Sequence, residues 1–202
     1  LRVHIVFYKN DITPRRALSR VGKSYDRPYL QKNTEVQMTE FQELPRFMSR
    51  DNTCFFTGHR TIPAEQKSAL GRAVEKKIYE LAKKDYMYFI AGGALGFDMF
   101  AESIVLRAAR QNPNIKLILA LPCIDQTLRW STLPNFIEIM KEYKRISGLA
   151  ECVYYVSDVS YYNGCMQKRN QFMVDHSSVC IAYYNGSRYG GTKQTVGMAA
   201  RA

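Results

Sequence analysis

Two glycine-rich segments in the sequence could bind an anion through their backbone. Residues 92–96 hold three glycines, and Gly190 and Gly191 form a pair. Because glycine has no Cβ, a ligand can approach its backbone closely. The N–H groups at the start of a helix bind phosphate well, since the helix dipole adds positive potential there. Two such segments at one edge of a fold would predict a phosphate-binding site.

Charged and aromatic side chains outside these glycines are further candidates. Arg60 follows Gly58 and His59, and its planar guanidinium could hold a phosphate or carboxylate bidentately. Solvation of Arg60 and local packing of His59 are the alternatives. Trp130, the only tryptophan, could stack on a nucleobase or cover the neighbouring helix, and the sequence does not choose between these roles.

Lys168 and Arg169 form a basic pair in the first turn of an expected helix, and Asn170 follows them. A cation at this position opposes the helix dipole, so we expect Arg169 to face an anionic ligand or another loop. Asp98 could contact a ligand or cap the helix that follows it. Asp98, Glu102 and His59 are the candidates for acid–base chemistry, because such chemistry needs a titratable group within reach of the ligand.

Apolar runs alternate with helical patterns from residue 52 onward. Runs that are apolar throughout are typical of strands buried on both faces, and helices between them place the strands parallel. The sequence therefore predicts an α/β fold, a Rossmann-like three-layer αβα sandwich with a mostly parallel sheet of five or more strands. We expect strands at 53–57, 86–91, 115–121, 151–156 and 179–184, and helices at 63–84, 99–111, 134–146, 166–175 and 192–202.

In parallel sheets of this kind, ligands bind beyond the carboxyl ends of the strands, at the point where the strand order reverses. The candidate segments follow the expected strands, so we expect them at this edge. Arg60 follows the first of these strands, and Arg169 lies in the helix after the fourth. We place these two strands on either side of the reversal, and so expect both arginines to face one crevice.

Residues 1–51 differ from the rest of the sequence. They contain Pro14, Pro28 and Pro45, scattered charges and no sustained hydrophobic period. A strand at 1–7 would have no evident partner strand nearby. We expect a basic, poorly ordered N-terminal extension at 1–51 and a Rossmann-like domain at 52–202. The formal net charge of +11 is shared between them, as +4 and +7.

Composition excludes several classes of protein. No apolar run approaches the roughly 20 residues of a membrane helix, and the first ten residues are too polar for a signal peptide. We therefore expect a cytoplasmic protein with no membrane partner. No cysteines have Cys-x-x-Cys spacing, so we predict no metal site and expect Cys54, Cys152 and Cys180 to be small buried side chains. The basic charge favours anionic partners.

Four motifs occur here in the order of one known family. They are Thr57-Gly58-His59-Arg60, Gly92-Gly93-Ala94-Leu95-Gly96-Phe97-Asp98, Arg169-Asn170 before Val174-Asp175, and Gly190-Gly191-Thr192. Over residues 52–202 they resemble the SLOG superfamily, and within it the YpsA-like branch. The resemblance implies a Rossmann-like fold distantly related to DprA and LOG proteins, and a domain that senses or processes nucleotide-derived ligands. The family's fold usually ends with another strand, and the sequence stops at Ala202, so we expect either an uncovered sheet edge or a sequence that is not the whole domain.

One departure from the LOG enzymes concerns catalysis. Their motif resembles Pro-Gly-Gly-x-Gly-Thr-x-x-Glu, in which the glutamate serves hydrolysis. Here Thr192 is followed by Lys193, Gln194 and Thr195, so the acid is absent. We therefore do not carry the LOG chemistry over, and we predict no catalytic residue.

The function we predict is binding or sensing of a nucleotide or nucleotide-derived ligand. A nucleotide-processing hydrolase resembling an N-glycosidase and DprA-like single-strand nucleic-acid binding are the alternatives. We predict a nucleotide-derived small molecule as partner, only weak binding of nucleic acid and no other cofactor, and a homo-oligomer stays open. The predicted ligand-binding residues are Thr57, Gly58, His59, Arg60, Gly92, Gly93, Ala94, Gly96, Asp98, Arg169, Asn170, Gly190, Gly191 and Thr192.

Overall fold

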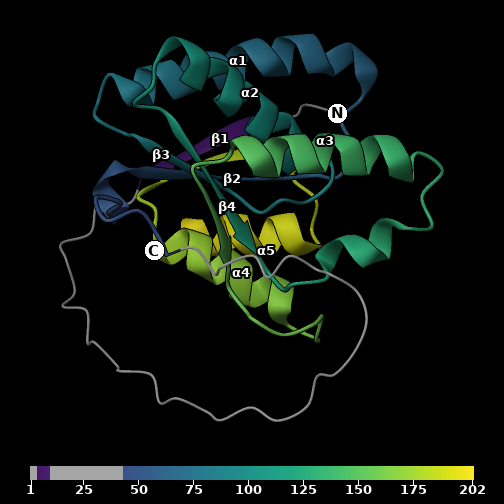
Figure 1. The fold of residues 1–202 in the computed structure, drawn as a ribbon. Helices are drawn as coiled ribbons and strands as arrows, with labels where there is room; N and C mark the ends of the chain where they lie inside the picture. Colours follow the sequence, from purple (N-terminus) through teal and green to yellow (C-terminus); the bar gives the residue numbers. More distant parts are fainter. Residues whose placement is uncertain (1–3, 10–42) are drawn as a thin grey trace, which may run out of the picture.

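The computed structural model describes residues 4–9 and 43–202, and a six-stranded sheet forms its centre (Figure 1). The strand order is β1-β6-β2-β3-β4-β5. Neighbouring strands from β6 to β5 are parallel, and β1 is antiparallel to β6. The strands are β1 (His4–Lys9), β2 (Thr53–Gly58), β3 (Tyr88–Ala91), β4 (Lys116–Leu121), β5 (Cys152–Tyr155) and β6 (Val179–Tyr184).

Helices cover both faces of the sheet, which confirms the expected three-layer sandwich. Figure 1 shows α1, α2 and α3 on one face and α4 and α5 on the other. The helices are α1 (Ala64–Ala82), α2 (Phe97–Gln111), α3 (Phe136–Leu149), α4 (Cys165–Asp175) and α5 (Gly191–Ala199). Two short 3-10 helices, η1 (Arg50–Asn52) and η2 (Gln126–Trp130), complete the described elements.

The parallel strands β2 to β6 are largely apolar because each contributes side chains to two hydrophobic clusters. Phe56 and Phe89 face α1 and α2, whereas Phe55 and Ile90 face the layer of α4 and α5. This alternation follows from the period of two residues along a strand. All five cysteines are free and buried, as expected for Cys54, Cys152 and Cys180. Within the described residues, no helix is long and apolar enough to span a bilayer.

The described parts of residues 1–51 pack against the domain. Strand β1 pairs with β6 in a register that sets His4 against Tyr184, so β6 has a neighbour on both sides. The strand considered at residues 1–7 thus has a partner, which is too far away in sequence to be inferred from local patterns. Leu44 and Met48 pack against the cluster under α4 and α5. Residues 1–3 and 10–42 lie outside the described part, so the extension as a whole stays a prediction.

The strand order reverses between β2 and β6. The chain proceeds from β2 through β3 and β4 to β5, then returns to place β6 on the other side of β2. Our placement of the fourth expected strand, now β5, beside the reversal was therefore wrong, because β5 is an edge strand. The ligand edge expected from this topology lies beyond the carboxyl ends of β2 and β6.

Candidate functional site

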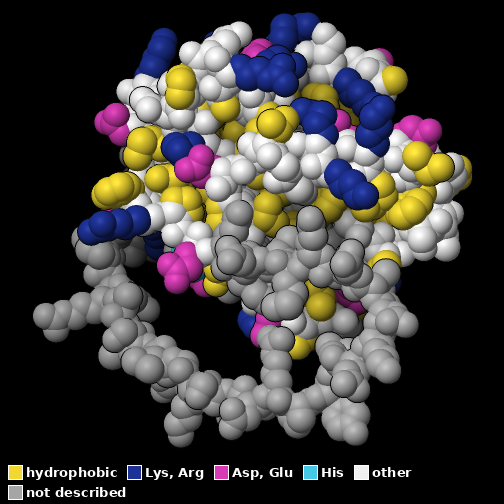
Figure 2. All heavy atoms as spheres, in the orientation of Figure 1, with side chains coloured by type: hydrophobic (Ala, Val, Ile, Leu, Met, Phe, Trp, Pro, Cys, Tyr) yellow, Lys and Arg dark blue, Asp and Glu magenta, His cyan; other side chains and the backbone are white. Residues whose placement is uncertain are grey.

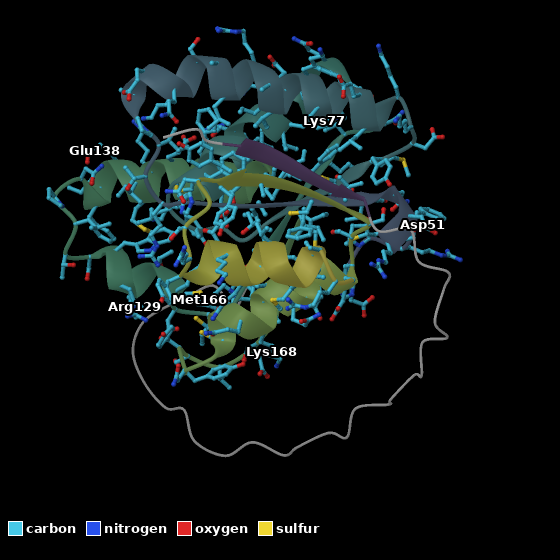
Figure 3. All side chains as sticks on the ribbon, turned by 180° about the vertical axis from the view of Figure 1, so that it is seen from behind. Asp51, Lys77, Arg129, Glu138, Met166 and Lys168 are labelled. Atoms are coloured by element: carbon cyan, nitrogen blue, oxygen red, sulfur yellow. The ribbon has the colours of Figure 1, made fainter. Side chains whose placement is uncertain are left out.

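A cavity of about 430 Å³ opens at the carboxyl ends of the parallel strands, a volume typical of small-molecule sites, which run from about 300 to 1,000 Å³. Figure 3 shows Arg129 and Met166 at this end of the molecule and Asp51, which precedes β2, at the opposite end. The predicted residues that line the cavity are Thr57, Gly58, His59, Arg60, Ala94, Asp98, Arg169, Asn170, Gly190, Gly191 and Thr192. Gly92, Gly93 and Gly96 are not among the lining residues.

The start of α5 forms an open wall of the cavity. Gly190 precedes the helix with φ of 105°, a left-handed conformation that favours glycine. A Cβ added at Gly190 or Gly191 would meet no atom within 4 Å. The Thr192 hydroxyl donates to the Gly58 carbonyl at 3.0 Å, which ties this turn to the end of β2. A ligand can therefore reach the backbone where a helix leaves its first N–H groups without partners.

The loop between β3 and α2 is filled by the protein itself. The N–H of Gly92 donates to Asp98 Oδ2 at 3.2 Å, and that of Gly93 donates to Glu102 Oε1 at 3.0 Å. A Cβ at Gly92 would clash with the Arg169 guanidinium. These two donors are already satisfied by carboxylates, so the backbone phosphate contacts predicted at Gly92 and Gly93 would require displacement of both.

The other glycines of this loop also make room for protein atoms. Gly93 has φ of 60°, and a Cβ there would lie 2.9 Å from Gln126 Nε2. Gly96 has φ of 91°, and a Cβ there would clash with the backbone of Arg60. Gly96, rather than Asp98, is the N-cap residue of α2. The capping role that we considered for Asp98 is therefore not what the structure shows.

Arg169 is the charge that organises this filled loop. It is 6% exposed, donates through Nη1 to the Gly92 carbonyl, and lies 3.8 Å from Asp98 Oδ2. Its Nε donates to Asn170 Oδ1 at 2.9 Å. Burial lowers the pKa of the Arg169 guanidinium, and the nearby Asp98 and Glu102 oppose that shift. Its position near the start of α4 is explained by another loop, the second of the two partners that we expected.

Two buried carboxyl groups lie beside Arg169. Burial raises the pKa of the Asp98 carboxyl, while Arg169 and the N–H groups of Gly92 and Ala94 lower it. Burial and then the charge of Asp98 raise the pKa of Glu102 well above its usual value. Glu102 is fully buried, and its Oε2 has no hydrogen-bond partner among the described residues. Glu102 does not line the cavity, so it is not placed to reach a ligand there.

His59 is held by three elements around the cavity. Its Nε2 accepts a hydrogen bond from the Asn185 N–H at 3.1 Å, and its ring stacks on Tyr184 with centroids 5.7 Å apart. Its backbone N–H donates to Tyr183 O, and its carbonyl accepts from Phe97 N–H at 3.1 Å. The local packing that we considered for His59 is therefore present.

Arg60 is the exposed cation of the cavity. It follows β2 and lines the cavity, and its guanidinium forms no hydrogen bond or ion pair within residues 4–9 and 43–202. Its charge helps to lower the pKa of Asp98, although burial is the larger influence on that group. Arg60 and Arg169 do line one cavity, as expected, but only Arg60 has a guanidinium without a protein partner.

Helix η2 supplies two further lining residues. Trp130 is 9% exposed, lines the cavity, and packs edge-on against Tyr143 of α3 with centroids 5.4 Å apart. Both roles considered for this tryptophan are thus compatible with its position. Gln126, which we did not predict, is 4% exposed and donates from Nε2 to the Gly93 carbonyl at 3.0 Å. Further lining residues that we did not name are Leu95, Met166, Met173, Ser187, Tyr189 and Thr195.

Comparison with known proteins identifies the family. The sequence description of the YspA SLOG family matches residues 57–202, most of the chain and all of the motifs around the cavity. The chain belongs to the YspA SLOG family. This confirms the resemblance seen in the motifs.

Similar proteins come from several bacteria. The chain is 35% identical over 125 residues to the SPbeta prophage-derived protein YoqJ of Bacillus subtilis, covering 56% of this chain and 70% of YoqJ. It is 23% identical over 140 residues to the UPF0398 protein BH1768 of Halalkalibacterium halodurans, covering 67% of each. Among solved structures, DNA processing protein A of Helicobacter pylori matches with a TM-score of 0.48 and 20% identity, over 75% of this chain and 62% of that one.

Proposed function

We propose that this domain binds a nucleotide or a nucleotide-derived ligand in the cavity beyond β2 and β6. The observation that carries the proposal is the open first turn of α5, with Gly190 and Gly191 facing empty space in the same cavity as Arg60, whose guanidinium has no partner within the described part of the chain. Backbone N–H groups at a helix start and an arginine together form a typical phosphate site. Membership of the SLOG family supports the same class of ligand.

The rest of the cavity suits the nucleoside part of such a ligand. Trp130, Met166 and Met173 offer apolar contact area, and the Asn170 amide lies beside them in the lining. Aromatic and thioether side chains pack well against a planar ring. In this arrangement the phosphate sits at α5 and Arg60, and the base lies toward η2 and α4.

Binding titrations with matched ligands test this proposal. Isothermal titration with a nucleoside 5′-monophosphate, the same nucleoside and inorganic phosphate separates the two halves of the site. We expect the monophosphate to bind most tightly and the nucleoside much more weakly. At 100 times its dissociation constant the ligand should stabilise the fold by about 2.7 kcal/mol. Equal affinity for the nucleoside and its monophosphate would contradict the proposal. So would the absence of binding by the monophosphates of all the common bases.

Binding or sensing fits the cavity better than hydrolysis by the residues we considered. Each acid–base candidate has a protein partner: Nε2 of His59 accepts from Asn185, and Asp98 contacts Arg169 and the Gly92 N–H. Glu102 lies outside the cavity lining. A general acid or base must reach the ligand directly or through one water. We therefore propose a sensor domain, and release of free base from a bound nucleotide would be the finding against it.

Single-strand nucleic-acid binding is the second candidate, and one pair of side chains favours it. Arg129 lies over the Tyr161 ring, with Cζ 4.3 Å from the centroid, and Tyr161 is 41% exposed. Aromatic and arginine surfaces of this kind stack on bases. Figure 2 shows Lys and Arg side chains spread over one face with Asp and Glu among them, which is not a single basic stripe. The +11 charge therefore gives weaker support than its size suggests.

Salt dependence separates the two candidates. Fluorescence anisotropy with a labelled single-stranded oligonucleotide measures affinity at several salt concentrations. We expect only weak binding near 0.15 M salt, in the range of about 10⁻⁴ to 10⁻⁶ M that is ordinary for non-specific contacts. Much tighter binding at that salt, lost in an Arg129→Ala variant, would favour the nucleic-acid function over the nucleotide sensor.

A further inference from the structure

The loop 185–190 connects β6 to α5 and forms one side of the cavity. Ser187 and Tyr189 of this loop line the cavity, and Tyr189 is 86% exposed. Gly186 and Gly190 have φ of 80° and 105°, and a Cβ on either would meet no atom within 4 Å. Two glycines in open space restrain a loop weakly, because glycine samples more backbone conformations than other residues. The position of this loop therefore depends on its hydrogen bonds.

Several of these hydrogen bonds stay within the loop or reach the residue before it. The Ser187 N–H donates to Asn185 Oδ1 at 3.0 Å, and the Ser187 hydroxyl donates to the Tyr189 carbonyl at 3.1 Å. The Tyr184 hydroxyl donates to the Ser187 carbonyl. These contacts shape the loop internally, but they do not fix it relative to β2 on the other side of the cavity.

Two hydrogen bonds connect this region to the end of β2. At the start of the loop, Nε2 of His59 accepts from the Asn185 N–H at 3.1 Å. Just beyond its end, the Thr192 hydroxyl donates to the Gly58 carbonyl at 3.0 Å. Adjacent residues of β2 and its following turn thus hold both ends of the segment that carries the open glycines.

The imidazole of His59 is itself well fixed. Stacking on Tyr184 and edge contact with Tyr183 restrain the ring, and backbone bonds to β6 and α2 fix its main chain. In this contact Nε2 is the acceptor of the Asn185 backbone N–H. That nitrogen is therefore engaged with the protein backbone and does not face a ligand as a donor.

We infer that His59 is a positioning residue. It fixes the backbone N–H of Asn185 and thereby holds the loop 185–190 and the start of α5 in the arrangement that leaves the cavity open to a ligand. It acts through the loop, because its Nε2 is engaged by Asn185 and not by a ligand. This inference rests on the proposed function for the statement that a ligand binds there. The hydrogen bond itself can be tested in the ligand-free protein.

The experiment compares two variants that keep different halves of the imidazole. In His59→Gln, the side-chain oxygen can occupy the place of Nε2 and accept from Asn185. In His59→Phe, the ring and its stacking on Tyr184 remain, but the acceptor is lost. His176→Phe is the control, because His176 ends α4 and its Nδ1 contacts the Phe172 carbonyl instead.

Two measurements decide the inference. Amide hydrogen exchange of 185–190 without ligand should be about fivefold faster in His59→Phe, as expected for the loss of one hydrogen bond, and near the wild-type rate in His59→Gln and His176→Phe. Affinity for a nucleoside 5′-monophosphate should fall by a similar factor only in His59→Phe.

The outcomes separate this inference from the proposed function. An unchanged exchange rate in His59→Phe would overturn the positioning role. An equal increase in exchange rate in His59→Phe and His59→Gln would overturn it as well. If exchange responds as expected but the wild-type protein binds neither the monophosphate nor inorganic phosphate, the positioning role stands and the proposed nucleotide function fails.

Discussion

The two glycine-rich loops of this domain begin helices at the same edge of one sheet, yet they differ in what occupies the space beside them. The guanidinium of Arg169 lies beside Gly92. Carboxyl oxygens of Asp98 and Glu102 accept hydrogen bonds from the backbone N–H groups of Gly92 and Gly93. Beside Gly190 and Gly191 there is no atom within 4 Å of an added Cβ. The first loop is a structural junction, and the second is open to a ligand.

This difference shows that a glycine-rich helix start has two uses. The absence of a Cβ makes room, and the neighbouring elements decide whether protein or ligand takes that room. In the filled loop, Arg169 of α4 and the carboxyl groups of Asp98 and Glu102 of α2 occupy the space that a bound anion and its cation would otherwise occupy. The experiments below test whether the first loop is closed by protein atoms and whether the cavity beside the second binds an anion.

Removal of Arg169 should have the largest effect. Arg169→Ala leaves Asp98 buried without its cation, and breaking a buried ion pair from one side costs about 4 kcal/mol of unfolding free energy. Urea denaturation measures this loss. Arg60→Ala is the matched control, because that exposed guanidinium has no partner among the described residues and its removal should change stability by less than about 0.5 kcal/mol. Similar losses in both variants would remove the distinction between the two arginines.

Added volume in the filled loop should have the next largest effect. Gly92→Ala sets a methyl group against the Arg169 guanidinium, and overpacking of a buried site costs about 3 kcal/mol at the upper end of its usual range. Gly191→Ala places the same methyl group in open space, so stability should be unchanged or slightly higher. Thermal unfolding of the two variants, measured side by side, checks the contrast. A stable Gly92→Ala protein would show that the first loop can open.

Loss of the exposed arginine should weaken binding rather than folding. Arg60→Ala should cost about 2 kcal/mol of affinity for a nucleoside monophosphate, the usual size for a hydrogen bond to a charged group. Arg60→Lys should restore little of it, because lysine lacks the planar fork that binds phosphate bidentately. Isothermal titration measures both variants. Full affinity in Arg60→Ala would mean that the anion does not bind at the end of β2.

Much of the fold could be predicted from the sequence because it depends on local patterns. The run 179–184 became β6 with those bounds, and the helix expected at 63–84 became α1 (Ala64–Ala82). Two features could not be predicted, because they depend on contacts distant in sequence. These are the place of β6 beside β2, which fixes the reversal of strand order, and the pairing of β1 with β6.

For the site, residue types predicted location better than role. Their positions after the strands were enough to predict that Arg60, Asp98, Arg169 and Gly190 line one cavity. Their roles depend on neighbours that no local pattern reports. Only the fold brings Arg169 of α4 against the loop after β3, and this contact separates a structural arginine from one that is free to bind a ligand.

A test of Glu102 asks how tightly the filled loop is closed. Its expected effect on unfolding free energy, taken per pH unit, is the smallest of these predictions. Burial and the adjacent Asp98 raise the pKa of this carboxyl in the folded protein above its value of 4.5 in the unfolded chain. The folded state therefore holds the proton more tightly, and the stability that Glu102 contributes is fully present below pH 4.5 and is lost as pH rises through the folded pKa.

Glutamine at position 102 has the same shape, can accept from the Gly93 N–H, and does not titrate. The unfolding free energy of Glu102→Gln relative to the wild type should therefore be flat below pH 4.5 and rise above it, by at most about 1.4 kcal/mol per pH unit. Urea titrations from pH 4 to pH 9 measure this difference, in which titrating groups that do not interact with Glu102 cancel. A difference that does not change with pH would mean that water reaches Glu102, and that the loop after β3 is more open than its contacts with Arg169 and Asp98 indicate.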